Sequence, residues 1–89
     1  MPQVEVPSRY RVPTKGQGLI DVEGRTVREC IEAVEAKYPG FLELVFDEKG
    51  EVNRFVRLFV NGDAVARDAP DTPVSDGDRV QILAAAAGG

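Results

Sequence analysis

The pattern that most limits how this chain can fold is a single amphipathic helix with strand-like segments on both sides. Between residues 26 and 38, apolar side chains recur at helical spacing and form one stripe suited to packing on a sheet. The residues of this stripe are Val27, Cys30, Ile31, Val34 and Tyr38. Thr26 and Glu29 form a capping box that starts the helix, and Pro39-Gly40 ends it. We therefore expect one main helix packed on one sheet.

Segments with the alternation of β-strands lie before this helix. Residues 4–6 alternate and continue after Pro7 as a mixed stretch to residue 12, and residues 19–23 resume the alternation after a glycine-containing turn, which predicts an N-terminal hairpin. Because Pro7 cannot donate a backbone hydrogen bond, the first strand should have an irregular or edge half.

Further strand patterns follow the helix. Residues 41–46 predict a short helical turn that closes the side of the core. Residues 54–60 form the strongest strand pattern and should be central, and Asn61-Gly62 predicts a tight turn into a short strand. Residues 79–83 predict a last strand that lies beside the first in a mixed sheet.

Length and composition limit the kind of protein. A chain of 89 residues holds one domain with a thin core, and 43% apolar with 29% charged residues is ordinary for a soluble globular protein. No apolar run approaches the roughly 20 residues of a membrane helix, and the first residues lack the features of a secretory signal. We therefore expect a cytoplasmic protein that does not bind membranes.

Charge and cysteine content exclude several function classes. A net charge of −4 argues against nucleic acid as a partner, although Arg9, Arg11, Arg54 and Arg57 could form a local basic patch for an acidic protein. Histidine is absent and Cys30 is the only cysteine. The sequence therefore predicts no disulfide, no zinc site and no metal site of other kinds. Cys30 lies on the apolar stripe and is expected to fill the core.

The strand at residues 54–60 predicts a docking surface. If Val56, Leu58 and Val60 face the helix, the side chains of Phe55, Arg57 and Phe59 face the other way, onto an open face of the sheet. Exposed aromatic residues mixed with arginine are typical of partner sites. The alternative is that a loop covers them.

The end of the sequence is a slender tail. Residues 84–89 are four alanines followed by Gly88 and Gly89, and an extended segment of this length reaches on the order of 20 Å. Glycines lack Cβ atoms and can thread a channel too narrow for other residues. The alternative interpretation is a frayed terminus. We expect a domain at residues 1–83 and a flexible tail at residues 84–89.

The whole chain resembles the ubiquitin-like β-grasp sulfur carriers of the molybdopterin-synthase small-subunit and thiamine sulfur-carrier superfamily. The features that carry the resemblance are the opening hairpin, the helix, the strand and turn ending at Asn61-Gly62, Asp76-Gly77-Asp78 and the terminal Gly88-Gly89. The pieces Asn53-Arg54-Phe55-Val56 and Asp76-Gly77-Asp78-Arg79-Val80 look most like the branch that supplies a cysteine synthase. The fold that this resemblance implies is α+β: a ubiquitin-like β-grasp with a mixed four- to five-stranded sheet on one main helix and a short helical turn.

The resemblance also implies a mechanism. A ubiquitin-activating-type enzyme would use ATP to adenylate the carboxylate of Gly89, and sulfide equivalents would then displace AMP and leave a thiocarboxylate. The tail residues Ala86, Ala87, Gly88 and Gly89 would thread into the partner. The chain would be a carrier without catalytic side chains of its own, and it would hold no cofactor stably. The sulfur-accepting enzyme would be a cysteine synthase or the large subunit of molybdopterin synthase.

Other functions stay open at this point. The chain could be the small subunit of molybdopterin synthase, which delivers sulfur to a pterin precursor. It could instead be a ubiquitin-like protein modifier, in which the carboxyl group of Gly89 ends as an isopeptide on a target lysine. A third possibility is a β-grasp interaction domain with an idle tail.

Overall fold

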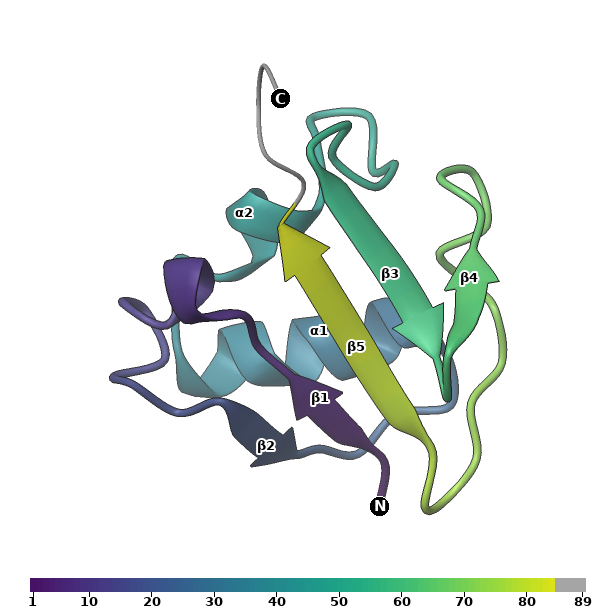
Figure 1. Cartoon of the computed structure of the whole chain (residues 1–89), viewed down its shortest axis with the longest axis horizontal. Helices are drawn as coiled ribbons and strands as arrows, with labels where there is room; N and C mark the ends of the chain where they lie inside the picture. The colour runs from purple at the N-terminus through teal and green to yellow at the C-terminus, as the bar shows by residue number, and fades with distance from the viewer. Residues whose placement is uncertain (85–89) are drawn as a thin grey trace.

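A computed structural model describes residues 1–84 as one sheet with helices on one side (Figure 1). The elements in chain order are β1 (Gln3–Glu5), η1 (Ser8–Tyr10), β2 (Leu19–Asp21), α1 (Val27–Lys37), α2 (Leu42–Val45), β3 (Val56–Val60), β4 (Asp63–Val65) and β5 (Arg79–Ala84). The strand order is β2-β1-β5-β3-β4. The mixed β-grasp sheet expected from the sequence is confirmed, with five strands.

β5 is the middle strand of the sheet. It pairs in parallel with β1, with Val4 opposite Val80, and antiparallel with β3, with Leu58 opposite Ile82. The prediction that the last strand lies beside the first is therefore confirmed. The expectation that residues 54–60 are central needs correction, because β3 has neighbours on both sides but lies second from the edge. Local sequence pattern does not distinguish two interior strands.

The core lies between the sheet and α1, which runs behind the sheet in Figure 1. The buried residues of α1 are Val27, Cys30, Ile31 and Val34, as the helical stripe predicts. Val80 and Ile82 of β5 are buried against this layer, and Phe41 closes its side just before α2. At roughly 25 cal/mol per Å² of apolar area, this burial supplies the main favourable term in folding.

The first turn of α1 has the predicted cap. Thr26 Oγ1 accepts a hydrogen bond of 3.1 Å from the backbone N–H of Glu29, and Glu29 Oε1 accepts one of 2.8 Å from the backbone N–H of Arg25. The carboxylate thus satisfies the amide one residue before the cap rather than the cap's own amide. The tight turn at Asn61 and Gly62 is also confirmed, since both residues have positive φ angles of 50° and 88°.

The first strand is shorter than predicted. Residues 4–12 do not form one strand: β1 ends at Glu5, and a 3-10 turn follows Pro7. Local bonds replace the ladder, because the Tyr10 N–H donates to Pro7 O at 2.9 Å and Arg11 Nε donates to Val6 O at 3.0 Å. The sequence signal for this break is the missing N–H of Pro7.

The bounds of three other strands also shift. β2 ends at Asp21, two residues before the predicted limit of 23. β3 begins at Val56 rather than at 54, because Asn53 Oδ1 accepts a 3.0 Å bond from the Phe55 N–H and folds this segment into a turn. β5 extends one residue past the predicted limit of 83 to Ala84, which pairs with Val56.

We predict that the cap at Thr26 stabilises the whole fold. Thr26→Ala should lower the free energy of unfolding by about 1 kcal/mol, because the Glu29 amide loses its acceptor. Urea denaturation followed by circular dichroism measures this difference. Thr26→Ser is the control, since it keeps the hydroxyl and should retain most of the stability. Equal losses in the two variants would contradict the capping role.

Candidate functional site

The candidate site is the end of the sheet at which β5 terminates. β5 finishes at Ala84, beside the first residue of β3 and at the same end of the molecule as α2 (Figure 1). The predicted tail residues Ala86, Ala87, Gly88 and Gly89 lie outside the described residues. Their roles stay predictions, as does the boundary between domain and tail. What the structure adds is the surface from which the chain continues.

The open face of the sheet lies on the side away from α1. Arg57 pairs with Leu83, and Phe59 with Gln81, so these four side chains share that face. Among residues 1–84, the helices α1 and α2 lie behind the sheet in the view of Figure 1 and leave its front open. The structure therefore brings Arg57 and Phe59 together on one surface, as expected.

The aromatic residues of this face differ in exposure. Phe55 belongs to the turn before β3, and 42% of its surface is exposed. Phe59 is half-buried, less exposed than expected, because it lies between neighbours on both adjoining strands. Leu83 and Leu19 are exposed apolar residues on the same face that the sequence interpretation missed. Strand alternation could have identified Leu83, because the side chain of a residue next to the core-facing Ile82 points to the opposite face.

The four arginines proposed as a basic patch have separate roles. Arg11 is part-buried and holds the loop after β1 through its bond to Val6 O. Arg9 is exposed on η1, which follows β1. Arg54 and Arg57 are both exposed at the start of β3, and the Arg54 guanidinium lies 5.1 Å from the centre of the Phe55 ring.

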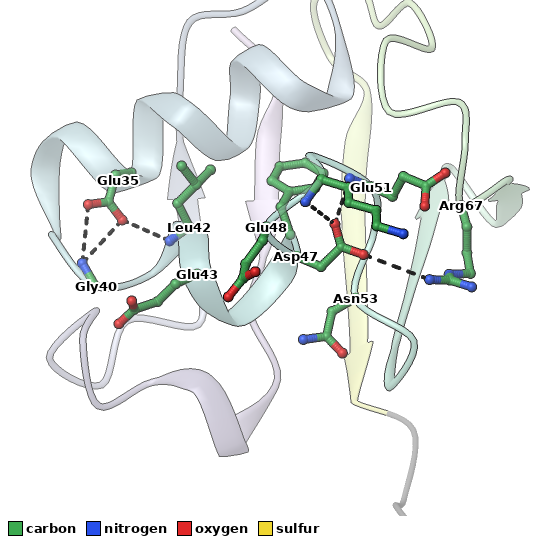
Figure 2. Close-up of a pocket in the computed structure, with 11 residues that line it drawn as sticks. Glu35, Gly40, Leu42, Glu43, Asp47, Glu48, Glu51, Asn53 and Arg67 are labelled. Atoms are coloured by element: carbon green, nitrogen blue, oxygen red, sulfur yellow. Dashed lines mark hydrogen bonds and ion pairs between the residues drawn. The ribbon is translucent and has the colours of Figure 1, made fainter.

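A broad groove of about 1270 Å³ opens on the α2 side of the molecule (Figure 2). Two of its carboxylates hold backbone amides. Glu35 Oε1 accepts bonds from the N–H groups of Gly40 at 3.1 Å and Leu42 at 2.8 Å. Asp47 Oδ1 accepts bonds from Lys49 at 2.9 Å and Glu51 at 3.0 Å. These carboxylates fold the loops around α2, which is a structural role.

Residues 1–84 contain no group of three or more histidine, cysteine, aspartate or glutamate residues placed to hold a metal ion. None of the helices in this part of the chain has the length and apolar character needed to cross a membrane.

Cys30 is the only thiol of the chain and is fully buried in α1. Burial, with a smaller contribution from the nearby Glu29 carboxylate, raises the pKa of the Cys30 thiol from 9.0 to about 11. The thiol is therefore protonated at neutral pH, and only a thiolate is an effective nucleophile. The expectation that Cys30 fills the core is confirmed.

Comparison with known proteins connects this architecture to a family. The model of the ThiS family matches residues 4–89. The sulfur carrier protein CysO of Mycobacterium tuberculosis is 37% identical over an alignment of 89 residues, which covers 97% of this chain and 96% of that protein.

Solved structures agree with the sequence comparison. The crystal structure of M. tuberculosis CysO superposes with a TM-score of 0.89 at 34% identity, and covers 97% of this chain and 100% of that one. A chain in the crystal structure of the Amycolatopsis orientalis BexX/CysO complex gives a TM-score of 0.88 at 32% identity, with both chains fully covered. The small archaeal modifier protein 1 of Methanosarcina acetivorans covers 99% of this chain and 95% of its own at 23% identity, with a TM-score of 0.80, which shows a shared fold.

We predict that Cys30 is inert to a thiol-specific disulfide reagent in the folded protein at pH 7 to 9 and reacts once urea unfolds the chain. Because the raised pKa favours the neutral thiol in the folded state, its contribution to stability is complete below pH 9.0 and is lost as the pH rises through about 11. Absorbance of the released leaving group measures labelling, and Cys30→Ala is the blank. Equal labelling rates in folded and unfolded protein would show that the thiol is accessible.

Proposed function

The chain belongs to the ThiS family, and we propose from this premise that it is a sulfur carrier protein of cysteine biosynthesis, adenylated and then thiocarboxylated at Gly89. The observation that carries the proposal is the 37% identity to CysO over nearly the whole of both chains. The fold supports it, because β5, the last element in the described part of the chain, ends at Ala84, a few residues before Gly89 in the sequence.

The chemistry needs an acyl group rather than a side-chain site. The Gly89 carboxylate attacks the α-phosphorus of ATP, forming an acyl adenylate and releasing pyrophosphate. A sulfide equivalent then attacks the acyl carbon, and AMP leaves with the electron pair of the broken C–O bond. The product is a thiocarboxylate, a sulfur nucleophile at neutral pH that needs no histidine to activate it. ATP belongs to the activating enzyme, and the carrier holds no cofactor of its own.

Cys30 is not the group that carries sulfur. A persulfide carrier needs an accessible thiol of low pKa, whereas Cys30 is fully buried and its pKa is raised to about 11. Glu35 and Asp47 are occupied by backbone amides and are not placed to act as an acid–base pair. The carrier is therefore a protein co-substrate, and catalysis is the work of its partners.

Two partners are required for this cycle. The first is a ubiquitin-activating-type enzyme that adenylates Gly89, and the second is the cysteine synthase that accepts the sulfur. The A. orientalis BexX/CysO complex supports an assembly of this kind, since a similar protein is found there in complex with a second protein. Because loading consumes ATP, the cycle belongs in the cytoplasm.

We predict that the protein gains the mass difference between sulfur and oxygen when it is incubated with the activating enzyme, ATP and a sulfur donor. Intact-mass spectrometry measures the gain, and fragmentation places it on Gly89. Cys30→Ala should gain the same mass, because the buried thiol takes no part. Gly88→Val should gain none, since a β-branched side chain obstructs a narrow channel.

The melting temperature of Gly88→Val is the control for folding and should equal that of the wild type, because residue 88 lies beyond β5. A wild-type protein that shows no gain in mass under these conditions would overturn sulfur carriage. A gain in mass that disappears in Cys30→Ala would show that the Cys30 thiol carries the sulfur.

The open sheet face serves as the docking surface in this proposal. Phe55, Arg57 and Phe59 lie on or beside it, and the exposed Leu83 extends its apolar area toward the end of β5. An aromatic and aliphatic centre with arginine at its edge is the composition of an interface core. The face is continuous with the point from which the tail leaves, so one partner can bind both.

We predict that Phe59→Glu weakens binding to the activating enzyme by at least about tenfold, since interface aromatics often contribute 2 kcal/mol or more. Isothermal titration calorimetry measures the dissociation constant, and thermal melting measures stability. Val12→Glu is the matched control, because Val12 is 87% exposed and lies on the loop between β1 and β2, off this face. A larger effect of Phe59→Glu on melting than on binding would place Phe59 in the core.

A further inference from the structure

Two arginines lie beside the end of β5. Arg57 pairs with Leu83 across the β3–β5 ladder, and Arg54 precedes Val56, the partner of Ala84, by two residues. Both arginines are exposed. We refer to Arg54 and Arg57 as the arginine rim.

Ion pairing distinguishes the arginine rim from three of the other arginines, whereas Arg9, Arg11 and Arg25 also form no ion pair within residues 1–84. Arg28 pairs with Asp71, Arg67 with Asp47 and Arg79 with Glu5, at N–O distances between 3.0 and 4.0 Å. Within residues 1–84, no ion pair connects Arg54 or Arg57 to a carboxylate of the chain. The three paired arginines stabilise loops and strands, whereas the two rim arginines have no such structural partner in this part of the protein.

Local packing prepares the rim for a protein partner. The Arg54 guanidinium lies over the ring of Phe55, at 5.1 Å from its centre, and this contact holds the guanidinium plane while its N–H groups stay available. Arg57 lies next to Leu83, which is 51% exposed. Arginine beside exposed aromatic and aliphatic groups is a composition found at the centres of protein interfaces.

The rim is a basic exception in an acidic protein. The chain has a net charge of −4, and at the same end of the sheet Glu43 of α2 is exposed. Figure 1 shows α2 and the start of β3 on opposite sides of the end of β5. The exposed charges are therefore negative on α2 and positive at the start of β3, and this difference favours an acidic partner surface on the β3 side.

The shape of the rim favours a protein surface over a small anion. Neither the groove of Figure 2 nor the smaller hollow lined by Asn61 and Arg79 includes Arg54 or Arg57. A free phosphate at such an exposed site would stay hydrated, and each ion pair would contribute little binding free energy. A partner with several carboxylates can contact both guanidiniums at once while its apolar groups cover Phe55 and Leu83.

We propose that the arginine rim binds aspartate and glutamate side chains that border the tail entrance of the adenylating enzyme. This inference rests on the proposed function and adds to it the charge of the partner surface. The rim speeds encounter and sets the rotational position of the carrier, with the tail pointing into the entrance. Because exposed charges are screened within about 10 Å at 0.1 M salt, this contribution decreases as salt is added.

The test compares two double variants that each remove two positive charges. Arg54→Gln/Arg57→Gln removes the rim, and Arg25→Gln/Lys37→Gln removes an exposed arginine and an exposed lysine near the two ends of α1, away from the open face of the sheet. Surface plasmon resonance with immobilised adenylating enzyme measures association rates at low salt and at about 1 M salt, where the screening length is about 3 Å. Melting temperatures confirm that both variants are folded.

At low salt, the rim variant should associate about tenfold more slowly than the wild type, and the control variant should stay within about twofold of it. At about 1 M salt, all three proteins should associate at similar rates. If both double variants slowed association equally, the effect would come from net charge alone, and the proposed role of the arginine rim would be overturned. Unchanged association, or slowing that persists at high salt, would also overturn it.

These outcomes are separate from those for sulfur carriage. Binding is measured without ATP or a sulfur donor, so a salt-dependent rim can be present in a protein that gains no sulfur. In that case the sulfur carrier proposal fails, and the proposal that the arginine rim binds an acidic surface of the partner stands. Conversely, the rim variant could be thiocarboxylated with an unchanged KM for the carrier. That result would leave the sulfur carrier proposal intact and refute the proposed role of the arginine rim.

Discussion

The pairing of β5 between β1 and β3 is the constraint on which the rest of the structure depends. The strand buries Val80 and Ile82 against α1 and connects both halves of the sheet by backbone hydrogen bonds. Because the last element within residues 1–84 is also the middle strand of the sheet, the position of residue 84 is fixed by the whole fold. A tail that continues from this strand starts at a defined place and direction, and a partner needs to recognise only the surface around it.

Some charged side chains make contacts that stabilise the fold, whereas others are exposed and make no such contact in the described part of the chain. Arg28 connects α1 with two loops: it donates to Asp71 and to the carbonyl of Gly50, and it lies 5.2 Å from the centre of the Phe46 ring. Glu35 holds the start of α2 in a similar way. A domain of 89 residues has a thin core, and such contacts hold the segments that the core does not reach. Arg54 and Arg57 have no such structural task in the described part of the chain.

Local signals predicted the elements that depend on local interactions. The cap at Thr26, the stripe of α1 and the positive φ angles at Asn61 and Gly62 all follow from nearby residues. The central position of β5 depends on pairing between distant segments, which periodicity does not encode. The turn after Pro7 rests on local bonds, and its sequence signal is the missing N–H of Pro7. For the site, parity placed Arg57 on the open face but overestimated the exposure of Phe59, since its neighbours come from other strands.

The fold alone does not select the chemistry, because an archaeal modifier protein at 23% identity shares it with a TM-score of 0.80. In the proposed function a glycine carboxylate is made reactive by adenylation, and a carrier and a modifier would then differ in the nucleophile that attacks the acyl carbon. That choice is made where the partner holds the activated end. In the proposed function, the carrier influences this choice through the surface around the end of β5, where we propose that Leu83, Phe55 and the arginine rim contact the partner. Differences among members of this fold should therefore concentrate on that surface, while the buried pairing of β5 is kept.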